Sequence, residues 1–305
     1  MRNALLAFVL LLVAGVAAAA TPRDALLVDT AWLKQHLHDR NLVLLQVGDQ
    51  ASFDAGHIAG ARGITLKDVS AGDGNGNALS LEMPNAAELR EKLEALGISD
   101  DSRVIVLFGT DWVTPSTRVL FTLQYAGLGA RASLLDGGLP AWVRAGGAVT
   151  KAPTPAKRGK LAPLALQPIV VDAATVRARL GTPGYAIVDG RAAAFYDGVD
   201  HGMNRDGSMH RPGHVHGAHS IPFTSIANDD LMVKSTAELR ALFDRAGVKP
   251  HDTVIGYCHV GMQTTAMLLA ARILDHPVLL YDGSFQDWSG HADYPVDNPS
   301  EGSAK

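Results

Sequence analysis

Only one cysteine, Cys258, occurs among the 305 residues of this chain. A single cysteine forms no disulfide within the chain, so the fold has to be held by packing rather than by covalent cross-links. Positive charge is also in short supply, because 27 Lys and Arg residues face 31 Asp and Glu residues and the net charge is −4. Nucleic acids are bound through an excess of basic side chains, so this balance argues against a nucleic-acid partner.

Long apolar runs are scarce, and the one at the N-terminus is short. Residues 1–20 place Arg2 before an apolar run from Ala4 to about Val16, followed by small residues typical of a cleavage site. This run, like every later one, falls short of the roughly 18 apolar residues that cross a membrane. We therefore expect a signal peptide over 1–20 and export to the periplasm or another extracytoplasmic space, with no membrane partner after cleavage. Retention of 1–20 as an N-terminal anchor is the alternative.

The chain does contain an internal duplication. Removal of residues 1–20 leaves 285 residues, enough for two domains of about 140 residues each. Three sequence blocks occur twice and in the same order, namely 56–64 with 213–221, 89–108 with 239–258, and 134–142 with 280–288. Because a repeated order of blocks indicates a repeated structural unit, we expect two domains of one fold.

Each half alternates short apolar segments with helical patterns, which predicts parallel strands joined by helices and therefore the α/β class. In the second half the patterns predict strands at Ala186–Asp189, Thr253–Tyr257 and Val278–Leu280, and helices near Thr236–Ala246 and Thr264–Leu274. The segment 151–168 has four prolines and neither period, which is typical of a linker. We expect domains at 21–150 and 169–297, with a C-terminal tail at 298–305.

Cys258 follows the apolar segment TVIGY and precedes a helical pattern. A turn between a strand and a helix N-terminus exposes backbone N–H groups and the positive end of the helix dipole, which favours a thiolate and an anionic adduct. A buried cysteine that acts as a small apolar residue is the alternative. The equivalent position in the first half is Phe108, and Asp111 follows in its loop, so we expect only the second half to be catalytic.

Further motifs accompany this loop. The second half contains VLLYDGSFQDW at 278–288 and the step Asp189-Gly190-Arg191, whose first-half counterpart we place at Val47-Gly48-Asp49. A Gly-His-x-x-Gly-Ala element occurs in both halves, at 56–61 and 213–218. With Cys258 and its loop, these motifs closely resemble those of the rhodanese family of tandem-domain sulfurtransferases, over nearly all of residues 25–297.

The resemblance implies two rhodanese-like domains, each a parallel sheet flanked by helices, with the active site of the second domain at the cleft between them. It implies that Cys258 carries sulfur as a persulfide and that Thr264 caps the following helix. It assigns Arg191 to orienting an anionic donor, although a structural ion pair with Asp189 is the alternative. The persulfide would be held by the loop residues His259, Val260, Gly261, Met262 and Gln263. No cofactor and no metal is implied.

Two features depart from familiar members of the family. Phe195 stands where thiosulfate enzymes carry a second arginine, so we expect Arg205, Arg211 or His259 to compensate. Thr264 stands where related phosphatases and arsenate reductases carry an arginine that clamps a dianion, which argues against those activities. The histidines of 201–219 leave a metal site as an alternative, but they lack a fixed ligand spacing. Buried packing is expected for His57, Trp142 and Trp288.

The resemblance therefore predicts a sulfurtransferase that moves sulfur from a small anionic donor to a thiophilic acceptor. Thiosulfate is the preferred donor and 3-mercaptopyruvate the alternative, because the loop CHVGMQT matches the usual loop of neither enzyme closely. A lone cysteine cannot release its own sulfur by forming a disulfide, so the acceptor is expected to be external: cyanide, a thiol or a dithiol protein. A persulfide carrier without turnover, or a binding module for a partner protein, is the alternative from another class.

Overall fold

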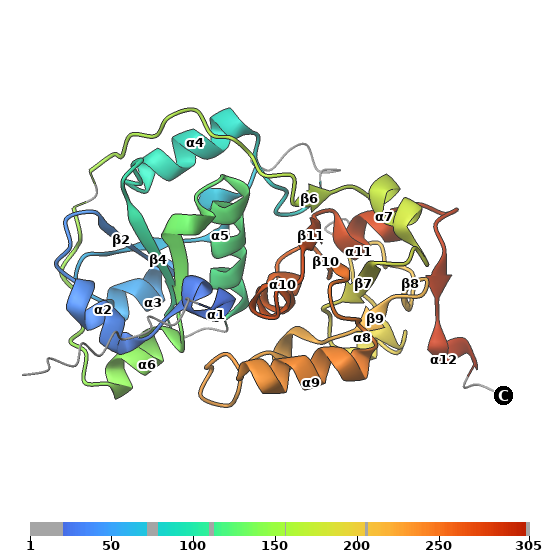
Figure 1. Cartoon of the computed structure of the whole chain (residues 1–305). Helices are drawn as coiled ribbons and strands as arrows, with labels where there is room; N and C mark the ends of the chain where they lie inside the picture. The colour runs from blue at the N-terminus through green and yellow to red at the C-terminus, as the bar shows by residue number, and fades with distance from the viewer. Residues whose placement is uncertain (1–20, 72–78, 110–112, 156, 205–206, 303–305) are drawn as a thin grey trace, which may run out of the picture.

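The computed structural model describes residues 21–71, 79–109, 113–155, 157–204 and 207–302. These residues form two five-stranded sheets, one in each half of the chain (Figure 1). Every neighbouring pair of strands in both sheets is parallel. The first sheet has the order β1-β5-β4-β2-β3, with β1 at Leu27–Val28, β2 at Leu42–Val47, β3 at Ala61–Ile64, β4 at Arg103–Phe108 and β5 at Ala132–Leu135.

The second sheet has the equivalent order β6-β11-β10-β7-β9. Its strands are β6 at Val170–Val171, β7 at Tyr185–Asp189, β9 at His219–Ser220, β10 at Thr253–Tyr257 and β11 at Val278–Tyr281. A small antiparallel pair joins β8 at His214–Val215 to β12 at Val296–Asp297. The α/β class, the parallel sheets and the three strands predicted in this half are confirmed.

Helices lie around both sheets (Figure 1). In the first half these are α1 (Pro22–Leu26), α2 (Thr30–His36), α3 (Gln50–Ala55), α4 (Ala86–Ala95), α5 (Thr114–Tyr125) and α6 (Gly138–Arg144), with 3-10 turns at Leu66–Val69 and Gly129–Arg131. In the second half they are α7 (Ala173–Arg179), α8 (Ala193–Tyr196), α9 (Thr236–Ala246), α10 (Thr264–Ile273), α11 (Ser284–Gly290) and α12 (Pro299–Gly302), with a 3-10 turn at Phe223–Ser225. The two predicted helices correspond to α9 and α10, and both are confirmed.

The ends of α9 illustrate how local sequence determines these elements. Ser235 and Glu238 form a capping box that satisfies free N–H groups at the start of the helix. Gly247 ends it with a φ of 83°, a left-handed conformation that suits glycine. Helix α10 is apolar on nearly all sides because it lies between the two halves, where α5 packs against it (Figure 1).

The two halves share one core and exchange equivalent contacts. Asp136, which follows β5, accepts a hydrogen bond from the backbone N–H of Val233 at 2.8 Å. Asp282, which follows β11, accepts one from the N–H of Met83 at 2.6 Å. The repeat relates Asp136 to Asp282 and Met83 to Val233. The two hydrogen bonds are therefore equivalent, and each half donates one and accepts the other.

The segment 151–168 crosses the surface beside α4 (Figure 1). Its described residues form no helix or strand, but its backbone is tied to the first half. The N–H groups of Gly159 and Leu161 donate to the backbone and side-chain oxygens of Glu94 at 2.7 and 3.0 Å, and Leu161 is buried.

Near the other end of the chain, Ser300 of α12 donates to Asp197 and Gly198.

No helix within the described ranges is long and apolar enough to cross a membrane. Residues 1–20, which we predict to be a signal peptide, lie outside these ranges.

Candidate active site

Cys258 lies directly after β10 and is fully buried. Its backbone N–H donates to the hydroxyl of Ser284 at 3.2 Å, and its carbonyl accepts from the N–H of Phe285 at 2.9 Å. The hydroxyl of Ser284 in turn donates to the carbonyl of Tyr281 at 2.9 Å. These bonds hold the backbone of the cysteine against the turn between β11 and α11, so the thiol has a defined position at the end of the sheet.

The loop from His259 to Gln263 leads from Cys258 into α10, which begins at Thr264. Among the described residues, no acceptor receives a hydrogen bond from the backbone N–H of any of its five residues. Gly261 has a φ of 76°, and a Cβ there would lie 2.9 Å from the carbonyl oxygen of Asp282. The loop therefore needs glycine at 261, and it offers a series of free donors beside the cysteine.

Ser284 has a φ of 53°, a left-handed conformation that costs energy for a residue with a side chain. The equivalent residue of the first half is Gly138, with a φ of 55°. A Cβ on Gly138 would lie 2.7 Å from the ring of Phe108, the residue that replaces Cys258. A large residue facing glycine in one half thus corresponds to cysteine facing serine in the other.

Arg191 is 1% exposed and is bound to Asp189. The guanidinium Nη2 lies 2.6 Å from Oδ2 of Asp189 and 2.7 Å from the carbonyl oxygen of Gly213, and its Nε lies 3.0 Å from both carboxylate oxygens. Burial lowers the pKa of Arg191, but the nearby carboxylate of Asp189 outweighs burial and raises it, and Cys258 adds to this rise. The guanidinium of Arg191 is therefore within electrostatic range of Cys258, and the adjacent carboxylate of Asp189 balances its charge.

The strand register shows which first-half residues are equivalent to the motif Asp189-Gly190-Arg191, and they differ from those predicted. Gln46 pairs with Leu107 on β4, as Asp189 pairs with Tyr257 on β10. Since the repeat relates Leu107 to Tyr257, the counterpart of Asp189-Gly190-Arg191 is Gln46-Val47-Gly48, and the predicted Val47-Gly48-Asp49 is wrong by one residue. The amide Nε2 of Gln46 donates to the carbonyl of Gly56 at 3.3 Å, and Gly56 is the counterpart of Gly213.

The imidazoles of His259 and His210 both lie near the positive charge of Arg191. Burial and the positive charge of Arg191 lower the pKa of His259 to about 4, and the same two causes lower the pKa of His210. The ring of His259 meets that of Phe195 edge to face, with centroids 4.5 Å apart. Nε2 of His210 lies 2.9 Å from Asn204, whereas its buried Nδ1 has no partner among the described residues. A neutral His259 supplies no positive charge at neutral pH.

Arg211, another residue expected to supply charge, is engaged with the backbone of the same half. Arg211 donates from both terminal nitrogens to the backbone carbonyls of Tyr294 and Trp288, at 2.9 and 3.0 Å. Arg205 lies outside the described residues, as does Asp111 of the first-half loop. Arg211 is thus engaged in holding the chain after α11 rather than free to bind a donor.

The helix cap that we expected from Thr264 is not formed. Gln263 is the N-cap residue, no side chain caps the helix, and the hydroxyl of Thr264 has no hydrogen-bond partner among the described residues. The side chain instead packs against Gly190 and Gly256, where a Cβ at Gly256 would lie 2.6 Å from Oγ1. Close packing of the helix on the sheet takes the place of capping.

The first half reaches the loop through Arg118 of α5, which is fully buried. Its Nη1 donates to the carbonyl of Gly261 at 3.0 Å and to Asp282 at 2.9 Å, and its Nη2 donates to the carbonyl of Leu81. Sequence analysis missed Arg118 and Ser284, and it considered His210 only among the histidines of a possible metal site. A lone arginine in the otherwise uncharged segment TPSTRVLFTLQY was a usable signal, because arginine is rarely buried without partners.

His214 and His216, two further histidines of 201–219, have partners within the second half. His214 stacks on Tyr196 with centroids 3.6 Å apart, and His216 lies 2.7 Å from Asp297. Within the described ranges, no group of three or more His, Cys, Asp or Glu side chains is placed to hold a metal ion. The packing roles predicted for His57, Trp142 and Trp288 are confirmed. All three side chains are buried, and their ring nitrogens form hydrogen bonds with backbone carbonyls.

Comparisons with known proteins agree with this architecture. The sequence model of the rhodanese-like domain matches twice, at residues 29–145 and 172–291. A protein of Pseudomonas aeruginosa named "Probable 3-mercaptopyruvate sulfurtransferase" is 31% identical over 247 residues, which cover 80% of this chain and 85% of that one. A thiosulfate sulfurtransferase of Rattus norvegicus is 26% identical, over 86% of this chain and 91% of its own.

Among solved structures, wild-type EanB superposes with a TM-score of 0.79 at 19% identity, covering 92% of this chain and 70% of its own. At that identity the likeness concerns the fold alone. The duplicated α/β fold and the two family matches define the class of sulfurtransferases with tandem domains. The chain belongs to the rhodanese family, and its activity is a rhodanese-type sulfur transfer between a donor and an acceptor.

Proposed function

We propose that Cys258 carries the transferred sulfur as a persulfide, between a small anionic donor and an acceptor outside the chain. The observation that carries this proposal is the loop of five backbone N–H groups without acceptors among the described residues, next to a buried cysteine and a helix N-terminus. Free N–H groups and the helix dipole favour a thiolate and its anionic adduct without a metal or a cofactor.

The proposed cycle has two displacements. The Cys258 thiolate attacks the outer sulfur of the donor, a new sulfur–sulfur bond forms, and the leaving group departs with the electron pair of the bond that breaks. An external nucleophile then attacks the outer sulfur of the persulfide and restores the thiolate. The loop amides of residues 259–263 stabilise the anionic sulfur in both states.

Thiosulfate, the donor preferred from sequence, is a dianion and needs more than one positive charge beside the thiolate. The described surroundings of Cys258 favour the alternative, 3-mercaptopyruvate, which has a single carboxylate. Arg191 is balanced by Asp189, and His259 is neutral at working pH. We therefore propose a small anionic donor with 3-mercaptopyruvate ahead of thiosulfate. Initial rates with the two donors, measured with cyanide as acceptor, decide between them, and a higher kcat/KM for thiosulfate reverses this order.

The central test is Cys258→Ser. The substitution changes one atom in the loop, so we expect a folded protein without sulfur transfer. Mass spectrometry after donor treatment is expected to show a gain of roughly 32 Da on the wild-type protein alone, since one sulfur is added to the thiolate. A sulfur adduct on the serine variant, or none on the wild type, contradicts the mechanism.

A persulfide carrier needs the same loop as an enzyme, so the acceptor separates these functions. We expect multiple turnovers with cyanide or a small thiol. A protein that takes up sulfur once and releases it only to a dithiol partner is instead the carrier that the sequence left open.

We also propose that residues 1–20 direct export to the periplasm or another extracytoplasmic space and are then removed. The support is the order of a basic residue, a short apolar run and small residues. The N-terminus of protein recovered from a periplasmic extract is expected near Thr21. An intact N-terminus in the membrane fraction indicates the anchor instead.

A further inference from the structure

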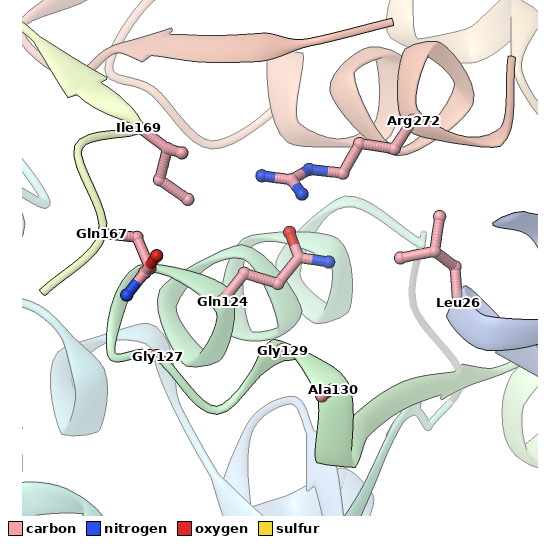
Figure 2. A pocket seen from close by; sticks show the side chains of 8 residues that line it. All are labelled: Leu26, Gln124, Gly127, Gly129, Ala130, Gln167, Ile169 and Arg272. Atoms are coloured by element: carbon pink, nitrogen blue, oxygen red, sulfur yellow. The ribbon is translucent and has the colours of Figure 1, made fainter. Parts of the chain in front are cut away.

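A hollow of about 360 Å³ lies between the two halves, away from Cys258 (Figure 2). It is bounded by the C-terminal ends of α5 and α10 and by the segment that leads into β6. Arg272 stands near the end of α10, eight residues after Thr264, which corresponds to about 12 Å along the helix. The hollow is therefore at the opposite end of α10 from the cysteine loop. Its lining residues are Leu26, Gln124, Gly127, Gly129, Ala130, Gln167, Ile169 and Arg272.

Arg272 has an unbalanced charge in this hollow. Its Nε is buried and has no hydrogen-bond partner, and no carboxylate among the described residues forms an ion pair with its guanidinium. Its contact is with the ring of Phe121, whose centroid lies 6.0 Å from Cζ. Burial lowers the pKa of Arg272, and no neighbouring acid offsets it. An arginine so placed lacks the oxygen acceptors that its planar fork of donors normally binds.

The side chain of Gln124 is a second polar group in the hollow. Gln124 is 7% exposed, and no hydrogen bond joins its amide to a described residue. Figure 2 shows the oxygen of this amide on the side of the guanidinium of Arg272 and its nitrogen turned toward Leu26. Gln167 uses its Nε2 to donate to the carbonyl of Ala165 at 2.9 Å, and Leu26 and Ile169 add apolar walls. The hollow thus combines one cation and an amide donor with apolar surface, and none of its lining residues is acidic.

We propose that this hollow binds a small organic carboxylate whose short apolar stem contacts Leu26 and Ile169. The carboxylate pairs with the guanidinium of Arg272 through two parallel hydrogen bonds, and Nε2 of Gln124 donates a third after the amide rotates to exchange its oxygen and nitrogen. A carboxylate with an apolar stem fits the lining better than an inorganic oxyanion, because two of the walls offer no hydrogen bonds. The ligand contacts both halves of the chain, and the site does not depend on the proposed persulfide chemistry.

The test uses butyrate as the probe and butyramide as its neutral counterpart, with binding followed by calorimetry on the full chain. We expect saturable binding of butyrate and at least tenfold weaker binding of butyramide, because only the anion pairs with the guanidinium. Arg272→Gln is expected to weaken butyrate binding about tenfold or more. Arg245→Gln, the same change at an exposed position of α9, is the matched control and is expected to leave binding unchanged.

A second variant guards against misfolding of Arg272→Gln. Ala130 is exposed at the rim, so Ala130→Asp introduces a repelling carboxylate without disturbing the core, and we expect about tenfold weaker butyrate binding. Equal binding of butyrate and butyramide overturns the proposal. Unchanged butyrate binding in both Ala130→Asp and Arg272→Gln also overturns it. Saturable binding of inorganic phosphate without binding of butyrate also overturns it, because it assigns the hollow to a different ligand class.

Discussion

The two halves of this chain differ most at a single structural position. In the first half Phe108 is buried against Gly138, and in the second half Cys258 stands beside Ser284. The aromatic ring fills the space that a side chain at 138 would need. The comparison shows two alternative arrangements at the end of this strand: an aromatic ring packed over a glycine, or a cysteine whose backbone N–H is hydrogen-bonded to a serine hydroxyl.

A second difference concerns one backbone carbonyl. The neutral amide of Gln46 holds the carbonyl of Gly56, while the ion pair of Asp189 and Arg191 holds the equivalent carbonyl of Gly213. Because an amide is sufficient in the first half, the fold itself does not require an ion pair at this point. The ion pair therefore distinguishes the half that carries Cys258 from the half that carries Phe108.

The largest expected effect comes from transplanting the thiol. We expect that Phe108→Cys in the Cys258→Ser protein leaves activity at least about 100-fold below wild type, because the first half has no equivalents of Arg191 and Ser284. Adding Gly138→Ser is expected to change little. The same Phe108→Cys in the otherwise wild-type chain is the control for folding. Recovery to near the wild-type rate shows that the first loop is competent.

The next effect is the loss of the ion pair. Arg191→Ala leaves the carboxylate of Asp189 buried and unpaired, so we expect unfolding free energy in urea to fall by about 3–5 kcal/mol. The folded fraction is expected to lose about 10- to 100-fold in kcat/KM, with partial recovery in Arg191→Lys. The exposed pair of Arg177 and Asp293 provides a control, since Arg177→Ala is expected to cost about 0–1 kcal/mol.

The ion pair of Asp189 and Arg191 can be replaced by the residues that occupy the equivalent positions of the first half. Asp189→Gln combined with Arg191→Gly copies Gln46 and Gly48, and we expect it to restore much of the stability without the activity. A double variant no more stable than Arg191→Ala contradicts the equivalence of the two carbonyl contacts.

A smaller effect tests the exchange of large and small residues. Cys258→Phe overfills the second half, and Ser284→Gly is expected to relieve it by recreating the arrangement of Phe108 and Gly138. We expect a coupling free energy of about 1–3 kcal/mol between the two substitutions, from urea unfolding of the four proteins in the cycle. Additive effects mean that the two positions do not share the same space.

The smallest effect concerns acid. The unfolded chain protonates His259 near its ordinary pKa of about 6.5, whereas the folded chain does so only near 4. As pH falls from 6.5 toward 4 the unfolded state binds a proton that the folded state does not, so stability falls. Its first-half counterpart, Gly109, has no such group. We expect His259→Asn to remove about 1–2 kcal/mol of the stability lost between pH 8 and pH 5. An unchanged loss assigns the acid sensitivity to other groups.

Much of the architecture follows from sequence, because buried parallel strands appear as short apolar runs bounded by turns. The strands at β7, β10 and β11 lie within one residue of their predicted bounds. The counterpart of Asp189 was misplaced by one residue, since apolar residues on both sides of a buried strand leave its register weakly specified by sequence. The contact of Thr264 with Gly256 could not be read either, because it depends on how closely a helix lies against a sheet.

The candidate site was predicted only in part. A cysteine between strand and helix was visible, but the partners of its loop come from elsewhere in the chain. Arg118 precedes the loop by 143 residues, and Ser284 follows Cys258 by 26. Contacts at such separations depend on the packing of the two halves, which no local pattern reports.

The exchange of contacts between Asp136 and Val233, and between Asp282 and Met83, has a consequence for how this chain is organised. When residue i of one unit meets residue j of another, and j meets i in return, the interface is isologous, the type found in dimers with a two-fold axis. The duplicated chain therefore has the internal arrangement of such a dimer joined by residues 151–168. A symmetric pair of identical subunits must carry any substitution twice. Joining the subunits in one chain removes this requirement, which allowed one copy to keep a cysteine where the other has a phenylalanine.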